Sequence, residues 1–124
     1  MSASDEYHGI VVEESLQDKG ALKGLRILGR RKGRDWTLLR VGVERVALKP
    51  VVERIRRNLR VESGVPFYAH FYRSGELIVI FPDREFHLSP DRKTWDPAIT
   101  YGRSVGIPAE QLDFAPCRFE DETY

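Results

Sequence analysis

The clearest hydrophobic pattern in the chain spans residues 67–81. Apolar residues alternate with Tyr68, His70 and Tyr72, and a Ser-Gly turn then leads into the unbroken apolar run 77–81. Alternation at period two predicts a half-buried strand, and a short continuous apolar run predicts a strand buried on both faces. The expected core is therefore a hairpin with one strand in the middle of a sheet.

Earlier in the chain, the pattern predicts three strands and one short helix. Residues 7–15 are rich in β-branched side chains, which favour a first strand. A short helix is expected over 18–23, with Gly24 ending it. Residues 25–28 and 36–43 flank a polar loop and predict a second hairpin. Four residues of this hairpin are assigned to the core face: Thr37, Leu39, Val41 and Val43.

Residues 48–60 have the strongest helical pattern. At 100° per residue the apolar side chains fall in one stripe, basic side chains occupy the rest, and Pro50 suits the first turn. One face of this helix is expected to pack and the other to be basic. The apolar stripe consists of Leu48, Val51, Val52, Ile55 and Leu59.

After residue 81 the residues 85–88 either extend the hairpin or add a strand, and a final helix is expected that begins at Thr94 or Asp96 and ends at Gly106. The first six elements then run βαββαβ, the ferredoxin-like order with an antiparallel sheet, followed by an appended C-terminal strand and helix. We interpret the chain as a single α+β domain over 1–124, with flexible tails at 1–6 and 115–124.

Composition excludes some classes of protein. At 124 residues and 41% hydrophobic content the chain fits one core, and no apolar run reaches the ~20 residues that a membrane helix needs. No membrane partner is expected. The N-terminus lacks a signal-peptide pattern, and the single cysteine, Cys117, forms no intrachain disulfide. These features predict a soluble, cytoplasmic protein.

The formal net charge of +1 hides a segregation of charge along the chain. Residues 1–18 carry a balance of −5, residues 19–60 of +11 and residues 61–124 of −5. Such a basic block predicts an anionic partner, either nucleic acid or an acidic protein surface, although a solvated helix face explains it as well. The candidate binding residues are Arg30, Arg31, Lys32 and Arg34 in the hairpin, and Arg54, Arg56, Arg57 and Arg60 on the helix.

Four aromatic side chains are expected on the sheet face opposite the long helix. Exposed rings on a four-stranded sheet stack bases in one common RNA-binding module, but the basic-aromatic motif of that module is absent here. We favour a covered face, with residues of the final helix and the segment after it lying over the rings. The rings belong to Trp36, Tyr68, His70 and Tyr72, and the expected cover includes Trp95, Ile99, Leu112 and Phe114.

No motif predicts a metal, a cofactor or a catalytic group. The three histidines, His8, His70 and His87, form no closely spaced pair, and no glycine-rich run matches a nucleotide-binding loop. Three hypotheses follow. The first is a small binding domain for nucleic acid or another anionic partner, and the second is a protein-interaction or homodimerisation module. The third is an enzyme with a small-molecule pocket near the last helix, which requires His70, Tyr72 or Tyr101 to converge.

Overall fold

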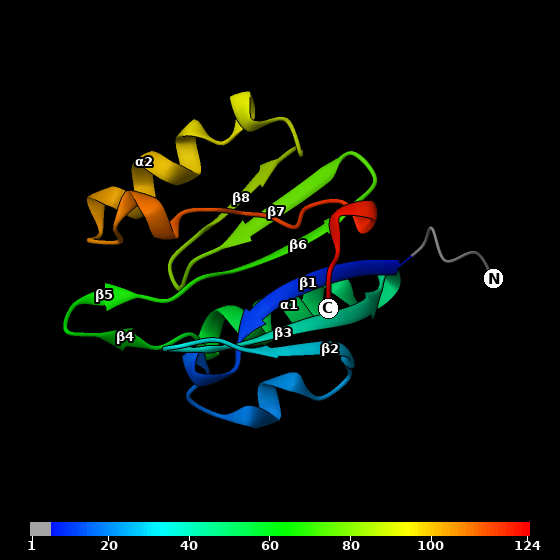
Figure 1. Cartoon of the computed structure of the whole chain (residues 1–124). Helices are drawn as coiled ribbons and strands as arrows, with labels where there is room; N and C mark the ends of the chain where they lie inside the picture. The colour runs from blue at the N-terminus through cyan, green and yellow to red at the C-terminus, as the bar shows by residue number, and fades with distance from the viewer. Residues whose placement is uncertain (1–5) are drawn as a thin grey trace.

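The computed structural model describes residues 6–124 and shows a mixed α+β fold, in which a six-stranded antiparallel sheet packs with two α-helices (Figure 1). The strand order in the sheet is β2-β3-β1-β6-β7-β8. The sheet strands are β1 (Glu6–Val12), β2 (Arg26–Lys32), β3 (Thr37–Glu44), β6 (Ala69–Arg73), β7 (Glu76–Ile80) and β8 (Glu85–Leu88), and the helices are α1 (Leu48–Asn58) and α2 (Asp96–Ser104).

The pairing register sorts the side chains of the sheet into two faces. Residues directly opposite each other in an antiparallel pair point to the same side. Ile10 of β1 lies between Arg40 of β3 and His70 of β6, so these three side chains share one face. Val11 and its partner Leu39 share the other face.

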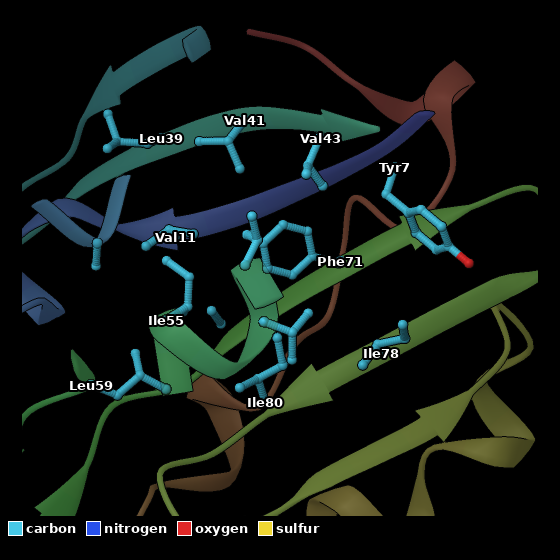
Figure 2. Close-up of a cluster of buried hydrophobic side chains, with 14 of the residues drawn as sticks. Tyr7, Val11, Leu39, Val41, Val43, Ile55, Leu59, Phe71, Ile78 and Ile80 are labelled. Carbon is cyan, nitrogen blue, oxygen red and sulfur yellow. The ribbon is translucent and has the colours of Figure 1, made fainter. Parts of the chain in front are cut away.

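The long helix α1 covers the face that contains Val11 and Leu39, which form a hydrophobic core with Phe71 and with Ile55 of the helix (Figure 2). The predicted core face of the hairpin is confirmed, because its four residues are at most 4% exposed. The predicted helix stripe is confirmed at Val51, Val52, Ile55 and Leu59, all buried, whereas Leu48 is partly buried at the edge of the core.

A second hydrophobic core lies on the opposite face, beneath α2 and the segment that follows it (Figure 1). The predicted cover is present, with Trp95 and Phe114 buried over the sheet. His70 and Tyr72 are 3% and 0% exposed, and Trp36 and Tyr68 are half-buried.

Gly9 allows an aromatic ring to lie directly against β1. A Cβ atom built at this position would stand 2.6 Å from Cδ2 of Phe71 and 3.0 Å from the carbonyl oxygen of His70. Real Cβ atoms do not approach other atoms this closely, so the close packing of β6 on β1 depends on the missing side chain.

Several local elements differ from the sequence prediction. The strand expected over 7–15 ends at Val12 and is followed by a 3₁₀ turn over Glu13–Ser15, and the helix expected over 48–60 ends at Asn58. The short helix expected over 18–23 is a 3₁₀ turn over Lys19–Leu22, and Gly24 ends it with a φ of 87°. Residues 61–66, for which the hydrophobic pattern predicts no strand, form a small hairpin of β4 (Val61–Glu62) and β5 (Val65–Pro66). Its turn has φ of 53° at Ser63 and 81° at Gly64, and two consecutive positive φ angles are what a tight hairpin turn needs.

The two predicted tails, 1–6 and 115–124, fall differently in the structure. Residues 1–5 lie outside the described part of the chain, and Glu6 already belongs to β1. The C-terminal segment 115–124 runs along the sheet face next to β1 and β6 (Figure 1). Its Cys117 is 6% exposed within the second core. Neither α-helix, nor any other helix within 6–124, is long and apolar enough to cross a membrane.

Candidate functional site

A cavity of about 380 Å³ opens on the sheet face that α2 covers. Small-ligand sites in proteins have volumes of roughly 300–1,000 Å³. The cavity lies where β1, the start of β3 and the start of β6 meet the β4–β5 hairpin and the segment after α2. These parts of the chain occupy the same end of the molecule in Figure 1.

The lining residues form an apolar floor and a polar mouth. Ile10, His70 and Ile107 are buried, whereas Glu62, Gln111, Asp113 and Ala115 are exposed. Between floor and mouth lie half-buried apolar and aromatic side chains, namely Val12, Trp36, Leu38, Val65, Pro66, Phe67 and Tyr68.

His70 is the buried polar group of the cavity floor. Its Nε2 donates a hydrogen bond to the carbonyl oxygen of Pro116 at 2.9 Å, because a carbonyl can only accept. Burial lowers the pKa of His70 from 6.5 to about 4, against the opposing effect of this bond. The ring is therefore neutral at physiological pH, and Nδ1 is its acceptor atom.

Three aromatic side chains line the cavity, namely Trp36, Phe67 and Tyr68. Trp36 and Phe67 meet edge to face, with 5.7 Å between their centroids and 77° between their planes. Tyr68 packs edge to face on Phe114 and donates its hydroxyl hydrogen to the carbonyl oxygen of Gln111. Burial raises the pKa of Tyr68 above its usual value, so the hydroxyl stays protonated.

The C-terminal segment is held on the sheet by Glu122. Its Oε2 accepts the hydrogen of the Tyr72 hydroxyl at 2.6 Å and lies 2.6 Å from Nδ1 of His8, and its Oε1 pairs with Nη1 of Arg40 at 3.0 Å. The Glu122 and Arg40 side chains are 12% and 16% exposed. This cluster joins residues from β1, β3 and β6 to one carboxylate and fixes the segment that borders the cavity.

The basic residues predicted on the hairpin fall on both faces of β2. Arg30 pairs with Leu39 in the register and therefore lies on the α1 face, where its Nη2 is 3.0 Å from Glu13 Oε1. Arg31 pairs with Leu38 on the opposite face, and its guanidinium lies over the ring of Tyr124 at 4.3 Å.

The basic residues predicted on the helix have partners close by. Arg56 and Arg57 pair with Glu53 at 2.6 and 3.1 Å. The carboxyl of Glu53 has a lowered pKa, chiefly because it accepts hydrogen bonds from Arg56. Arg54 donates to the carbonyl oxygen of Lys23, and Arg60 lies 3.3 Å from Glu62. Lys32 and Arg34, at the end of the hairpin, are exposed and make no ion pair within residues 6–124.

The structure brings together fewer of the proposed catalytic groups than the enzyme hypothesis requires. His70 lines the cavity, whereas the Tyr72 hydroxyl bonds to Glu122 and Tyr101 packs against Phe81 at 4.9 Å between centroids. Among residues 6–124, no group of three or more His, Cys, Asp or Glu side chains is placed to hold a metal ion.

Sequence reasoning missed most of the cavity wall. The pattern predicted a turn for Glu62, Val65 and Pro66, a further turn for Gln111, and irregular chain for Asp113. The available signal was the Ser63-Gly64 dipeptide between two β-branched valines, which is typical of a hairpin.

Comparisons of the chain with protein-family models, with curated proteins and with solved structures find no match.

Proposed function

We propose that this protein is a binding domain for a small organic molecule, held in the cavity between the sheet and the C-terminal segment. The observation that carries the proposal is the cavity itself, about 380 Å³ with a floor and wall that are mainly apolar. A concave, largely apolar site with a few polar groups at fixed positions is the usual form of a small-molecule site.

Binding is favoured over catalysis because the polar groups of the cavity are weak acids or bases at physiological pH. His70 donates to Pro116 and burial lowers its pKa to about 4, whereas the Tyr68 hydroxyl donates to Gln111 and has a raised pKa. A general acid or base works best with a pKa near the operating pH. These bonds fix the shape of the site and leave ring faces and apolar side chains to contact a ligand.

Titration with the neutral fluorescent probe N-phenyl-1-naphthylamine tests this proposal. We expect saturable binding of one probe per chain, with loss of binding in Leu38→Trp, because added bulk at a half-buried lining residue fills the cavity. Val46→Trp introduces the same indole ring at a side chain that is 85% exposed and does not line the cavity, so it should bind like the wild type. Failure of the wild type to bind the probe, or equal binding by both variants, would reject the proposal.

A second candidate function is binding of nucleic acid or another anionic partner at the tip of the β2–β3 hairpin. Lys32 and Arg34 support it, since they are exposed and have no ion pair with residues 6–124, unlike Arg56 and Arg57. Phosphate groups are bound mainly by such unpaired basic side chains.

Fluorescence anisotropy with single- and double-stranded oligonucleotides at low and physiological salt tests this candidate. Lys32→Glu combined with Arg34→Glu should abolish binding, whereas Arg56→Glu combined with Arg57→Glu should change it less. Absence of binding by the wild type at low salt would leave these residues as a solvated surface. Light scattering over a range of concentrations tests the homodimer alternative, which predicts a mass that rises towards twice 14.3 kDa.

We further propose that β1, β2, β3 and β6 form a ferredoxin-like unit to which the later strands and α2 are appended. The strand order β2-β3-β1-β6, antiparallel throughout, supports this interpretation. The departure from that pattern is the first crossover, which contains 3₁₀ turns in place of an α-helix. A cytoplasmic location also stays a proposal, supported by the single cysteine in the sequence.

A further inference from the structure

We infer that the ligand of the cavity is an amphipathic organic cation, whose apolar chain reaches the floor and whose ammonium head lies among the aromatic rings and carboxylates nearer the mouth. This inference rests on the proposed function and specifies the chemical class of the ligand. It is drawn from three properties of the lining: which charges it contains, which rings it presents, and how the two are distributed with depth.

The lining contains acidic side chains and no basic one. None of the residues that line the cavity is a lysine or an arginine, whereas Glu62 and Asp113 both carry carboxylates. The remaining titratable groups, His70 and Tyr68, are neutral at physiological pH. An anionic ligand, such as a fatty acid, would find no cationic partner in the cavity and would meet two like charges at its mouth.

The aromatic wall is suited to a cation. Trp36, Phe67 and Tyr68 all line the cavity, and the edge-to-face contact of Trp36 with Phe67 sets their ring planes at 77°. The face of an aromatic ring carries negative partial charge and attracts a cation within about 6 Å of its centroid. Aromatic side chains are also the groups that form cages around quaternary ammonium ligands.

Depth separates the two parts of the ligand. The floor residues Ile10 and Ile107 are buried, which suits an apolar chain, and the carboxylates of Glu62 and Asp113 belong to exposed residues at the mouth. An ammonium group has to stay near these carboxylates, because its transfer to an apolar floor without a partner is costly. The hydrocarbon chain of the ligand therefore lies at the floor of the cavity, and its ammonium head lies at the mouth.

Both carboxylates have an arginine nearby, which weakens their field without cancelling it. Arg60 lies 3.3 Å from Glu62, and Arg92 lies 3.8 Å from Asp113. The four side chains are between 47% and 73% exposed, so each pair is loosely held and screened by water. Neither arginine lines the cavity, so the ring wall and the carboxylates are what a ligand in it meets.

The test is calorimetric titration with three ligands that share a six-carbon chain and differ in head-group charge: hexyltrimethylammonium, 1-hexanol and hexanoate. We expect hexyltrimethylammonium to bind about tenfold more tightly than 1-hexanol, and hexanoate to bind most weakly. Tryptophan emission should change with binding, because Trp36 lines the cavity, and a variant with Trp95→Phe should retain that change.

Two variants separate the sources of the preference. Glu62→Gln combined with Asp113→Asn should weaken the binding of hexyltrimethylammonium more than that of 1-hexanol, which brings the two affinities closer together. Trp36→Leu keeps an apolar side chain but removes the aromatic ring, so it should weaken the binding of hexyltrimethylammonium more than that of 1-hexanol. Glu110→Gln is a matched control for the carboxylates, since Glu110 is exposed in the same region and does not line the cavity.

The outcomes distinguish this inference from the proposed function. Equal binding of the cation and the alcohol, or tighter binding of hexanoate, would overturn the cation inference and leave the cavity as a site for neutral or anionic molecules. Absence of binding by all three ligands, together with failure of N-phenyl-1-naphthylamine to bind, would reject the cavity as a site and the inference with it.

Discussion

The hydroxyl of Tyr72 donates a hydrogen bond to Glu122 at 2.6 Å, and this bond joins β6 to a residue 50 positions later in the chain. Tyr72 is fully buried, so its hydroxyl would lack a partner without the carboxylate. The same carboxylate lies against His8 and Arg40, and the irregular C-terminal segment is thereby fixed along the sheet.

The only thiol of the chain should react slowly while the protein is folded. Cys117 is 6% exposed, and burial raises the pKa of its thiol, so little of it is present as thiolate at neutral pH. We expect Ellman's reagent to modify it at least about tenfold more slowly in the native protein than in urea. An equal rate in both states would show that the segment around Cys117 opens freely.

Replacing Glu122 with glutamine should release the C-terminal segment. The change leaves Arg40 without its described ion-pair partner, and we expect the free energy of unfolding to fall by about 1–3 kcal/mol. Urea unfolding measures this loss, and faster modification of Cys117 reports the opening of the segment.

Glu120→Gln is the control for that variant, because Glu120 is exposed and has no ion pair within residues 6–124. It should match the wild type in both measurements. If Glu122→Gln also matched the wild type, the cluster around Glu122 would contribute nothing measurable to holding the segment.

The free energy of unfolding should decrease as the pH is lowered, because of the titration of His70. The pKa of His70 is about 4 in the folded protein and 6.5 in the unfolded chain. Between these values the unfolded chain binds a proton at His70 and the folded protein does not. Stability from this group is complete above pH 6.5 and is lost as the pH falls towards 4. One pKa unit corresponds to about 1.4 kcal/mol, which gives a loss of about 3 kcal/mol over this range.

Urea unfolding at pH 7 and pH 4.5 in the wild type and in His70→Gln isolates this effect from the titration of carboxyl groups. The variant should lose less stability between the two pH values than the wild type does. His87→Gln, at a histidine side chain that is 68% exposed, should follow the wild type. Parallel curves for the wild type and His70→Gln would contradict the prediction.

A methyl group at Gly9 should strain the packing between β1 and β6. Its Cβ would lie 2.6 Å from the ring of Phe71, so either the ring or the strand has to move. We expect Gly9→Ala to lower the free energy of unfolding by about 1–3 kcal/mol, as overpacking of a core does.

Phe71→Leu provides the test of that cause. The smaller side chain removes the ring atoms in question, so the cost of Gly9→Ala should be smaller in the Phe71→Leu background than in the wild type. Additive effects of the two substitutions would show that the ring is not what excludes a side chain at position 9.

The hydrophobic periodicity predicted the parts of the fold that bury one regular face of a strand or helix. Thr37, Val41 and Ile55 are buried as expected, because a sheet face and an amphipathic helix impose periods of 2 and 3.6 on the chain. Covering of the aromatic face was also foreseen, since Trp95 and Phe114 needed an apolar surface to pack on.

The candidate site was much harder to predict than the fold. The cavity depends on how the β4–β5 hairpin and the segment after α2 approach the sheet, and neither has a periodic pattern. Runs of basic residues showed where charge occurs but could not show that Glu53 lies within reach of both Arg56 and Arg57. Ion pairing of that kind depends on side-chain placement, which composition does not contain.

The two faces of the sheet are covered by different kinds of structure, and they therefore tolerate amino-acid replacements to different extents. One face is closed by the amphipathic helix α1, whose apolar stripe fits a regular core. The other is closed partly by irregular chain, anchored through a few side chains such as Glu122. Replacement of the exposed lining residues Gln111, Asp113 and Ala115 can therefore reshape the cavity while the α1 layer keeps its packing, so this face can accept a different ligand without a new fold.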